Sequence, residues 1–407
     1  MPVFLTKVRD ARGQASTKQI EAENLTAART KLKEQNLIAT EITEKRSADD
    51  MLAGVNRFFS DMQKVKLRDM TIFTRQFSTM VNAGVALIRT LNILSEQTDN
   101  KRFSKIIINI KDKVEQGNSL SDALKDHPKI FSKLYISMVR AGETGGVLDE
   151  VLNRLAAFLE AQAKLTAQIK GAMTYPVVVL VIAVAIFFFL LTFVLPIFKE
   201  MFDSMNAQLP AFTQMLINMS NAVRTSWYLV FGGIGGGIFA FIKFIKTPPG
   251  RIWWDNVKLK APVFGPLTRK VAVARFTRTL GTLLRSGVPL IGSLEIVQDT
   301  AGNIHISNAL GKVISAVKEG ETMTKPLVQT KVFPPMVTQM ISIGEETGAI
   351  DDMLTRIADF YDNEVETAVK ALTSLLEPLM MVLIGGMVGS IIIGMYLPMF
   401  SIIGAIG

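Results

Sequence analysis

The sequence predicts a mostly α-helical integral membrane protein, with three transmembrane helices, two homologous six-helix bundles in parallel repeat and a small N-terminal α+β module. Three observations predict this fold class. The chain of 407 residues is 49% apolar, which is above the usual content of a soluble domain because membrane spans add apolar length. Segments of it are long, apolar and uncharged. The phrase "RAGETGGVLDEVL" (140–152) returns as "SIGEETGAIDDML" (342–354).

The N-terminal module is expected over residues 1–47. Its pattern predicts a strand, a turn at Asp10 to Gly13, a strand, a helix from about Asn24 to Gln35 and a final strand. Residues 48–68 follow as a basic amphipathic linker. It either lies on a membrane surface or forms a plain solvated helix.

An internal duplication covers about 130 residues, and such repeats decide the fold before any single motif does. "FTRQFSTMVNAGVALIRTL" (73–91) is answered by "FTRTLGTLLRSGVPLIGSL" (276–294), and Gly117 by Gly320. Pro176 and Pro196 recur as Pro378 and Pro398. The duplication therefore predicts that each unit ends in its own membrane helix.

One unit is predicted to hold six helices. Phe73, Phe77, Met80 and Val81 share one helical face, and Gly84 can end that helix in a left-handed cap. Two more apolar faces follow, the second stopping near Gly117. "SLSDALKDHP" predicts a short fourth helix with Ser119 or Ser121 as N-cap. Ile130 to Arg140 make the fifth, and the sixth and longest starts at Val147 and points at Pro176.

The repeated phrase predicts a tight turn between the fifth and sixth helices. Gly142 would end the fifth helix, Gly145 and Gly146 would permit positive φ, and Asp149 with Glu150 would place negative charge on the first turn of the sixth. A plain helix hairpin explains these residues but not Glu143 or Glu345. Either each carboxylate accepts hydrogen bonds that lock its bundle, or it belongs to a surface that contacts a partner. The candidate loops are Gly142, Glu143, Thr144, Gly145, Gly146, Gly344, Glu345, Glu346 and Gly348.

Three segments are predicted to span a membrane. "YPVVVLVIAVAIFFFLLTFVL" (175–195) rises about 28 Å after Pro176, which matches a hydrocarbon core. "LMMVLIGGMVGSIIIGMYL" (379–397) is similar, and "WYLVFGGIGGGIFAFI" (227–242) is shorter, the alternative for it being a buried soluble helix. Pro176 and Pro378 are expected to couple bundle to span, either starting a helix or kinking a long one. Gly232, Gly236, Gly385 and Gly389 are expected to pack spans closely.

Lys and Arg are scarce between the first two spans, where the sequence has Lys199 and Arg224, and absent after Leu397. The positive-inside rule therefore predicts a cytoplasmic N-terminus, cytoplasmic bundles and an external C-terminus. The net charge of +9 then suits an anionic inner leaflet rather than nucleic acid. The expected divisions are the module 1–47, linker 48–68, first bundle 69–172, span 173–198, outer loop 199–226, span 227–245, linker 246–270, second bundle 271–374, span 375–398 and outer tail 399–407.

Few residues suit catalysis. The chain has no cysteine, and His127 and His305 each stand apart in polar stretches that predict surface histidines. It has no P-loop, zinc-protease motif or serine triad. No catalytic residue, cofactor or metal site is therefore predicted, although a cation site at Glu143, Asp149 or Glu150 stays open. A transporter is disfavoured because the spans lack ionisable residues between their ends.

"FTRQFSTMVNAGVAL", "EQGNSLSDAL", "RAGETGGVLDEVLNRLAAFLE" and "TYPVVVL" resemble the GspF/PilC family of inner-membrane platform proteins in type IV pilus and type II secretion machines. The resemblance covers nearly the whole chain. It implies a non-enzymatic scaffold that acts as a homo-oligomer such as a dimer. Its implied partners are a hexameric assembly or retraction ATPase, pilin or pseudopilin subunits, other inner-membrane assembly proteins and membrane lipids. The alternatives are a type II secretion platform of the same family and, more remotely, a permease or a membrane receptor.

Overall fold

The computed structural model describes residues 3–9, 15–22, 25–34, 38–44, 63–204, 209–262 and 264–406. The N-terminal module has strands β1 (Val3–Arg9), β2 (Ala15–Glu21) and β3 (Ile38–Glu44), with helix α1 (Leu25–Glu34) between the last two. The sheet is antiparallel in the order β2-β1-β3. The predicted order of strands and helix is therefore confirmed. The expected turn at Asp10 to Gly13 and residues 48–62 of the linker lie outside the described residues.

Six helices form the first bundle, as predicted. They are α3 (Leu67–Asn82), α4 (Leu87–Gln97), α5 (Lys101–Glu115), α6 (Leu120–Lys125), α7 (Lys133–Gly145) and the lower part of α8 (Leu148–Phe189). The core holds the buried rings of Phe73, Phe77, Phe103, Phe131 and Tyr135. Phe73 and Phe103 meet edge to face at 5.1 Å between centroids, a favoured aromatic geometry.

The second bundle repeats this arrangement with α13 (Phe264–Arg285), α14 (Leu290–Thr300), α15 (Ile304–Lys318), α16 (Thr324–Thr330), α17 (Pro335–Thr347) and the lower part of α18 (Ile350–Ile406). Positive φ recurs at the same places in both bundles, with 78° at Gly84 and 79° at Gly287, for example. Glycine is needed there because a Cβ would strain a left-handed residue. The predicted cap at Gly84 is confirmed.

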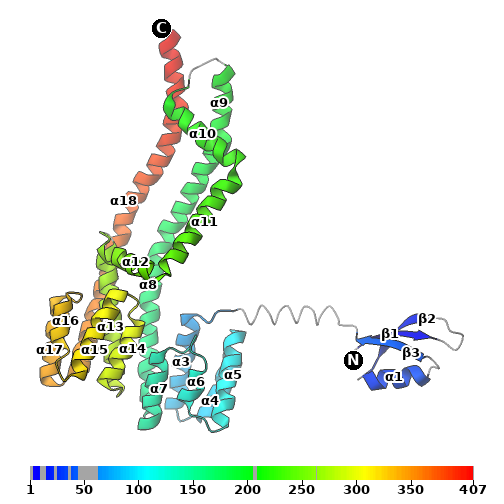
Figure 1. The fold of residues 1–407 in the computed structure, drawn as a ribbon, viewed down its shortest axis with the longest axis vertical. Helices are drawn as coiled ribbons and strands as arrows, with labels where there is room; N and C mark the ends of the chain where they lie inside the picture. The colour runs from blue at the N-terminus through cyan, green and yellow to red at the C-terminus, as the bar shows by residue number, and fades with distance from the viewer. Residues whose placement is uncertain are drawn as a thin grey trace.

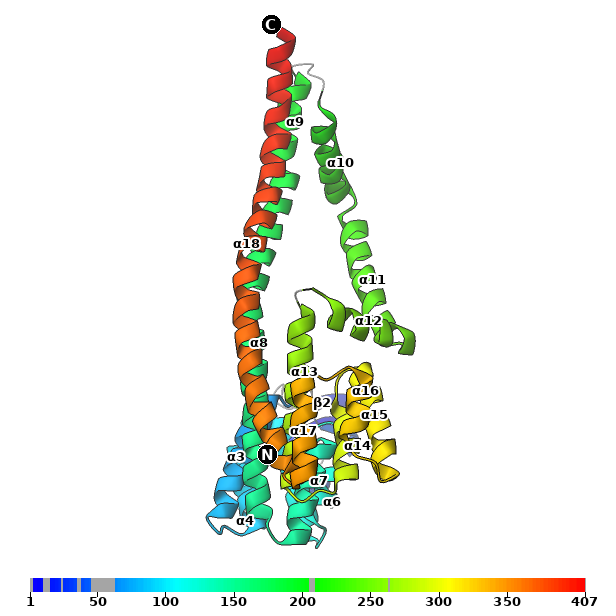
Figure 2. The same ribbon diagram turned by 90° about the vertical axis from the view of Figure 1, so that its left-hand side faces the viewer.

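Two continuous helices connect the bundles to apolar segments. Helix α8 passes through Pro176 and α18 through Pro378 and Pro398, so no new helix starts at these prolines. The two helices contact each other, and both bundles lie at the same end of them (Figures 1 and 2). A π-helical turn, η1 (Leu190–Val194), follows α8. There the Thr192 hydroxyl donates to the Phe188 carbonyl at 2.5 Å. This bond gives the carbonyl a partner where the regular helical hydrogen bonds are interrupted before Pro196.

In the described residues between the two bundles there are four helices, of which the sequence predicted one. Helix α9 (Leu195–Ser204) continues from η1, α10 (Ala211–Thr225) turns back against it, and α11 (Trp227–Ile245) descends to α12 (Pro248–Lys260). The expected outer loop 199–226 therefore contains α10, and the expected linker 246–270 contains α12 and the start of α13. Apolar side chains of α10, such as Leu216 and Ile217, bury themselves against Leu191 and Leu195, which explains why this polar-looking segment is helical.

Three helices in the described residues are long and apolar enough to cross a membrane. They lie within 148–202, 227–245 and 350–400, with mean hydropathy of 3.3, 1.8 and 2.1 in their most apolar windows. The large side chains of these segments are widely exposed, Val382 by 74% and Phe239 by 70%. Exposure of that extent on apolar helices fits a lipid environment.

Candidate functional site

The turn between α7 and α8 differs in detail from its prediction. Helix α7 runs on through Gly145, and Gly146 caps it with φ of 69°. In the second repeat Gly348 caps α17 with φ of 74°. The expectations that Gly142 ends the fifth helix and that Gly145 adopts positive φ were therefore wrong. One further helical turn forms because the backbone amides of Gly146 and Val147 still reach the carbonyls of Glu143 and Gly142.

Gly142 instead lets two helices approach closely. A Cβ at this position would lie 3.0 Å from Val151 Cβ and 3.1 Å from Leu148 Cα. The equivalent Gly344 has equally little space, because a Cβ there would lie 3.0 Å from Ile350 Cα. Both glycines are buried inside their helices. A side chain at either place would push α8 or α18 away from the preceding helix.

The carboxylate of Glu143 caps a neighbouring helix. It accepts hydrogen bonds from the backbone N–H of Leu120 at 2.5 Å and of Ser121 at 2.9 Å. These amides belong to the first turn of α6, where N–H groups have no partner within the helix and the helix dipole favours negative charge. The Ser119 hydroxyl accepts from the backbone N–H of Asp122 at 3.1 Å. Of the two predicted N-cap residues, Ser119 and Ser121, the structure therefore has Ser119.

Glu345 repeats this arrangement on α16. Its carboxylate accepts from the backbone N–H groups of Met323 and Thr324, the latter at 3.0 Å, and from the Thr324 hydroxyl at 2.5 Å. Two copies of one carboxylate therefore tie α7 to α6 and α17 to α16. Both oxygens of each glutamate already serve as acceptors for the protein's own donors.

The remaining residues of the two turns face outward. Thr144 and Glu346 are exposed, Thr144 donating to the Arg140 carbonyl and Glu346 accepting from Ser342 within its own helix. Asp149 and Glu150 lie in the first turn of α8, as Asp351 and Asp352 do in α18, which confirms that part of the prediction. Among the described residues no group of three histidine, aspartate or glutamate side chains is placed to hold a metal ion.

An arginine from the first helix of each bundle binds the long helix of the same bundle. Arg75 on α3 donates Nε and Nη2 to the two carboxylate oxygens of Glu160 on α8, both at 2.6 Å, and Nη1 to Asn153 at 2.8 Å. This hydrogen bond with Arg75 lowers the pKa of Glu160 and raises that of Arg75. Bidentate pairs of this kind fix geometry as well as charge.

Arg278 is the counterpart on α13. It donates to Asp359 at 2.7 Å and to Asp362 at 2.6 Å, both on α18. Burial lowers its pKa, but the hydrogen bonds with Asp362 and Asp359 outweigh burial, so the pKa of Arg278 is raised. Sequence analysis found both arginines as repeat identities and assigned them no role. Their acidic partners could have been found in the sequence, because the two repeats have an acid at equivalent positions, Glu160 and Asp362.

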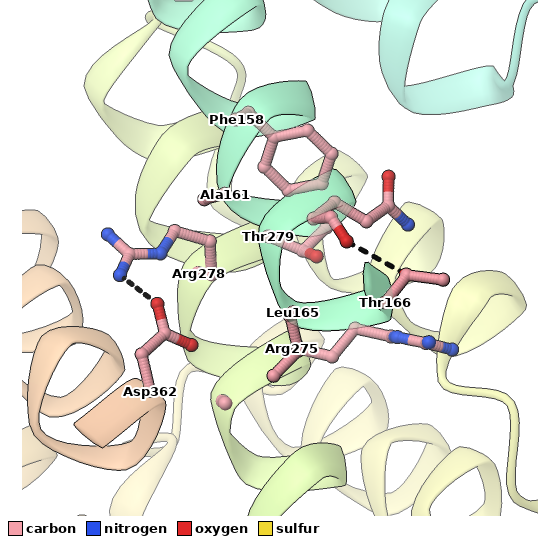
Figure 3. Close-up of a pocket in the computed structure, with 10 residues that line it drawn as sticks. Phe158, Ala161, Leu165, Thr166, Arg275, Arg278, Thr279 and Asp362 are labelled. Carbon is pink, nitrogen blue, oxygen red and sulfur yellow. Dashed lines mark hydrogen bonds and ion pairs between the residues drawn. The ribbon is translucent and has the colours of Figure 1, made fainter. Parts of the chain in front are cut away.

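The two repeats meet where α8 crosses α13 and α18. A small pocket there is lined by Phe158, Ala161 and Leu165 of α8 and by Arg278 and Thr279 of α13, with Asp362 of α18 at its edge (Figure 3). Polar contacts between repeats flank it. Gln168 donates to Glu366 at 3.2 Å and Lys133 pairs with Asp299 at 2.6 Å. Arg154 also donates to the carbonyl of Arg285.

Closer to the apolar segments the same helices share a hydrophobic seam. Val365, Val369 and Leu372 of α18 and Leu267 of α13 are buried together, with Leu165 and Ile169 of α8 against them. Pro176 is buried just above this seam, and Pro378 is exposed. The seam therefore joins the second bundle to both long helices.

Among the described residues, the glycines expected to pack spans have open space around them. A Cβ on Gly232, Gly236, Gly385 or Gly389 would meet no described atom within 4 Å. Close packing occurs at Gly394 instead, where a Cβ would lie 2.5 Å from Leu216 of α10. The Gly394 carbonyl also accepts from the buried Thr213 hydroxyl at 2.8 Å. Sequence analysis missed this contact because it predicted no helix in that loop.

The histidines lie in half-buried positions rather than fully at the surface. His127 Nε2 hydrogen-bonds Asn109 at 3.0 Å. Burial, and then the charge of Lys113, lower the pKa of His127. His305 stands near the start of α15, with its Nε2 buried and without a partner among the described atoms.

Known proteins resemble this chain over its full length. The family model described as "Type II secretion system (T2SS), protein F" matches residues 73–196 and 276–398, which are the two repeats, and that of its N-terminal domain matches 1–43. The type IV pilus assembly protein PilC of Myxococcus xanthus is 44% identical over 99% of this chain and 95% of its own. PilC of Thermus thermophilus is 43% identical over 100% of this chain and 99% of its own. The type II secretion system protein F of Vibrio cholerae is 34% identical over 98% of each. The chain therefore belongs to the type II secretion system protein F family and, with its three apolar helices, is an inner-membrane protein.

Proposed function

We propose that this protein is the inner-membrane platform of a type IV pilus assembly system. It couples a cytoplasmic assembly or retraction ATPase to pilin insertion or extraction, and it catalyses no reaction itself. The observation that carries the proposal is mechanical. Each bundle continues without a break into a helix that enters the apolar region, so a force on the bundle reaches the membrane through a helical backbone.

The orientation of the chain is part of the same proposal. Both bundles lie at one end of α8 and α18 (Figures 1 and 2), and the Lys and Arg distribution favours that end as cytoplasmic. The N-terminus is then cytoplasmic, the chain crosses three times, and the C-terminus is outside. Reporter fusions after Leu120 and after Leu310 should both report the cytoplasmic side, and opposite results would refute this arrangement.

The turns at Glu143 and Glu345 are the proposed contact surface for the ATPase. Each turn lies at the start of its long helix, with Leu148 and Ile350 preceding Tyr175 and Leu379 by 27 and 29 residues, or about 40 Å of helix. Both turns therefore reach a similar depth below the membrane, as docking to one ring would require. In this proposal the carboxylates hold the turns in shape, and the exposed Thr144 and Glu346 contact the partner.

Capture of the partners tests the proposal. The full chain in detergent should retain the assembly ATPase, and changing Thr144 and Glu346 to arginine should reduce that retention without changing the melting temperature. The retention of pilin is measured in parallel. If neither ATPase nor pilin is captured by the folded chain, the coupling role is refuted.

A type II secretion platform is the second candidate, supported by relatives such as that of Vibrio cholerae. The pilus assignment is preferred because the relatives with pilus names share 44% and 43% identity over the chain. A competition experiment, in which pilus and secretion ATPases compete for binding to the purified chain, discriminates the two systems. Preferential binding of the pilus ATPase supports the pilus assignment.

A further inference from the structure

A cavity of about 310 Å³ opens beside α12 and α13. It lies between α8, α12, α13 and the turn at 301–303. Its lining combines apolar and basic side chains. The apolar part comes from Ile169, Phe264, Leu267 and Val271, and the basic part from Lys258 and Arg275.

The cavity lies at the depth of lipid headgroups. Ile169 precedes Tyr175, the start of the apolar segment of α8, by six residues, or about 9 Å of helix. Lys243 and Lys246 end the apolar part of α11, directly before α12. On α12, Ile252 and Trp253 are 51% and 49% exposed. Exposed tryptophan and lysine at the end of a span are typical of the membrane interface.

Helix α12 is held firmly across this level. Its Trp254 ring contacts Phe241 of α11 at 5.5 Å between centroids. Its Asp255 carboxylate is buried, accepting from the backbone N–H of Ile304 at 2.9 Å and pairing with Lys258 at 2.9 Å. These bonds join α12 to both the span and the second bundle. The entrance of the cavity is therefore built from fixed elements, as a binding site requires.

Arg275 supplies a cation that the described part of the chain does not neutralise. Arg278, one turn further along α13, has two aspartate partners, whereas no carboxylate in the described ranges pairs with Arg275. The two side chains leave α13 in different directions, with Arg278 toward Asp362 and Arg275 away from it (Figure 3). Lys258 shares its charge with Asp255, so among the described residues that line the cavity Arg275 carries the main positive charge without a carboxylate partner.

We propose that this cavity binds an anionic glycerophospholipid of the membrane. The phosphate is bound by Arg275 with help from Lys258, because a guanidinium matches two phosphate oxygens. An acyl chain lies along Ile169, Phe264, Leu267 and Val271, removing apolar surface from water. A free phosphate would leave that apolar wall uncovered, so a lipid fits the whole cavity. The site is independent of the proposed role in pilus assembly.

Native mass spectrometry of the full chain tests the proposal. The detergent-solubilised protein is titrated with dioleoylphosphatidylglycerol, with dioleoylphosphatidylcholine and with inorganic phosphate as a competitor. We expect the anionic lipid to be retained at least about five-fold more than the zwitterionic one, with phosphate displacing little of it. Equal retention of both lipids, or full displacement by millimolar phosphate, would overturn the assignment.

Matched variants locate the binding. Arg275→Gln and the double change with Lys258→Gln should each lower retention of the anionic lipid about five-fold or more. Ala272→Leu, which narrows the cavity without changing charge, should also lower it. Arg269→Gln on the exposed side of the same helix is the control and should retain the lipid as the unchanged protein does. Unchanged retention in the Arg275 and Ala272 variants, or an equal loss in the Arg269 control, would refute this site.

Discussion

Glu143 and Glu345 show how one residue type serves the same purpose twice. Each carboxylate is shared between two backbone amides at the start of a short helix. A short helix gains little stability from its own hydrogen bonds, so such a cap holds α6 and α16 in place. The sequence indicated that these acids needed donors. It could not name them, because the donors lie more than 20 residues away.

Replacing Glu345 with Gln should loosen the start of α16. The amide keeps one acceptor oxygen, loses the charge and leaves a donor without its partner, at a cost of about 1–2 kcal/mol. Hydrogen exchange at Met323 and Thr324 should accelerate in the full chain. The matched control is Glu346→Gln, an exposed neighbour, which should leave both amides unchanged. Equal exchange in the two variants would contradict the capping role.

The glycines of the α7–α8 turn should respond differently to alanine. Gly142→Ala forces contacts near 3.0 Å with Val151 and Leu148 and should cost about 1–3 kcal/mol. Gly145→Ala is the control, because its Cβ would meet Val147 at an ordinary 3.4 Å in a helical position. Melting of the full chain should drop for the first variant and stay equal or rise for the second. The reverse order would show that Gly142 does not set the spacing of the helices.

At the scale of the element, the long helices depend on ion pairs with their own bundles. Arg75 binds Glu160 on α8, and Arg278 binds Asp359 and Asp362 on α18. The first and last helices of a bundle are thus joined in both repeats, although the acids are not identical. Both helices would otherwise be linked mainly by apolar side chains, which fix distance better than direction.

The Arg75–Glu160 pair predicts a pH dependence. The pKa of Glu160 is lowered in the folded protein, so the pair stabilises the fold above the ordinary glutamate value and this contribution is lost as pH falls through the lowered one. The side chains are 38% and 44% exposed, so screening limits the effect to below about 1 kcal/mol. The difference in melting temperature between the protein and Glu160→Gln should be present at pH 7 and vanish in acid. A difference that grows in acid would contradict the sign.

Elements with strong periodicity were predictable, and those fixed by packing were not. The duplication and the 3.6-residue pattern predicted both bundles and the α8 and α18 spans. Helix α10 has a mixed sequence, and its apolar side chains are buried against η1, α9 and α18, which lie elsewhere in the sequence. The sequence also predicted too short a helix α7. Gly142 was interpreted as the end of the helix, because its close packing against Val151 cannot be recognised from sequence alone.

At the scale of the whole molecule, the two repeats form a joined body. Contacts between them run from Lys133 and Asp299 to Gln168 and Glu366, with a buried seam above. The sequence predicted two like-oriented units. It gave no sign of this joint, because the residues in it differ between the copies and pair across a gap of 166 or 198 positions.

Crosslinking can measure this joint directly, because the natural chain has no cysteine. Gln168→Cys combined with Glu366→Cys should be joined within one chain by a short bismaleimide crosslinker, since the longer native side chains reach each other at 3.2 Å. Each single variant is the control for links between molecules. If the double variant is linked only between molecules, α8 and α18 are not adjacent at Gln168 and Glu366.

The unbroken passage of α8 through Pro176 makes small angles matter. Its 42 residues extend about 63 Å, so a tilt of about 5° at the base would swing the opposite tip sideways by roughly 5 Å, close to one helical pitch. Because α18 contacts it, the two tips would sweep together. In the proposed platform, a modest rocking of a docked ATPase ring therefore becomes a sideways stroke of about one helical pitch at the far end of the helix.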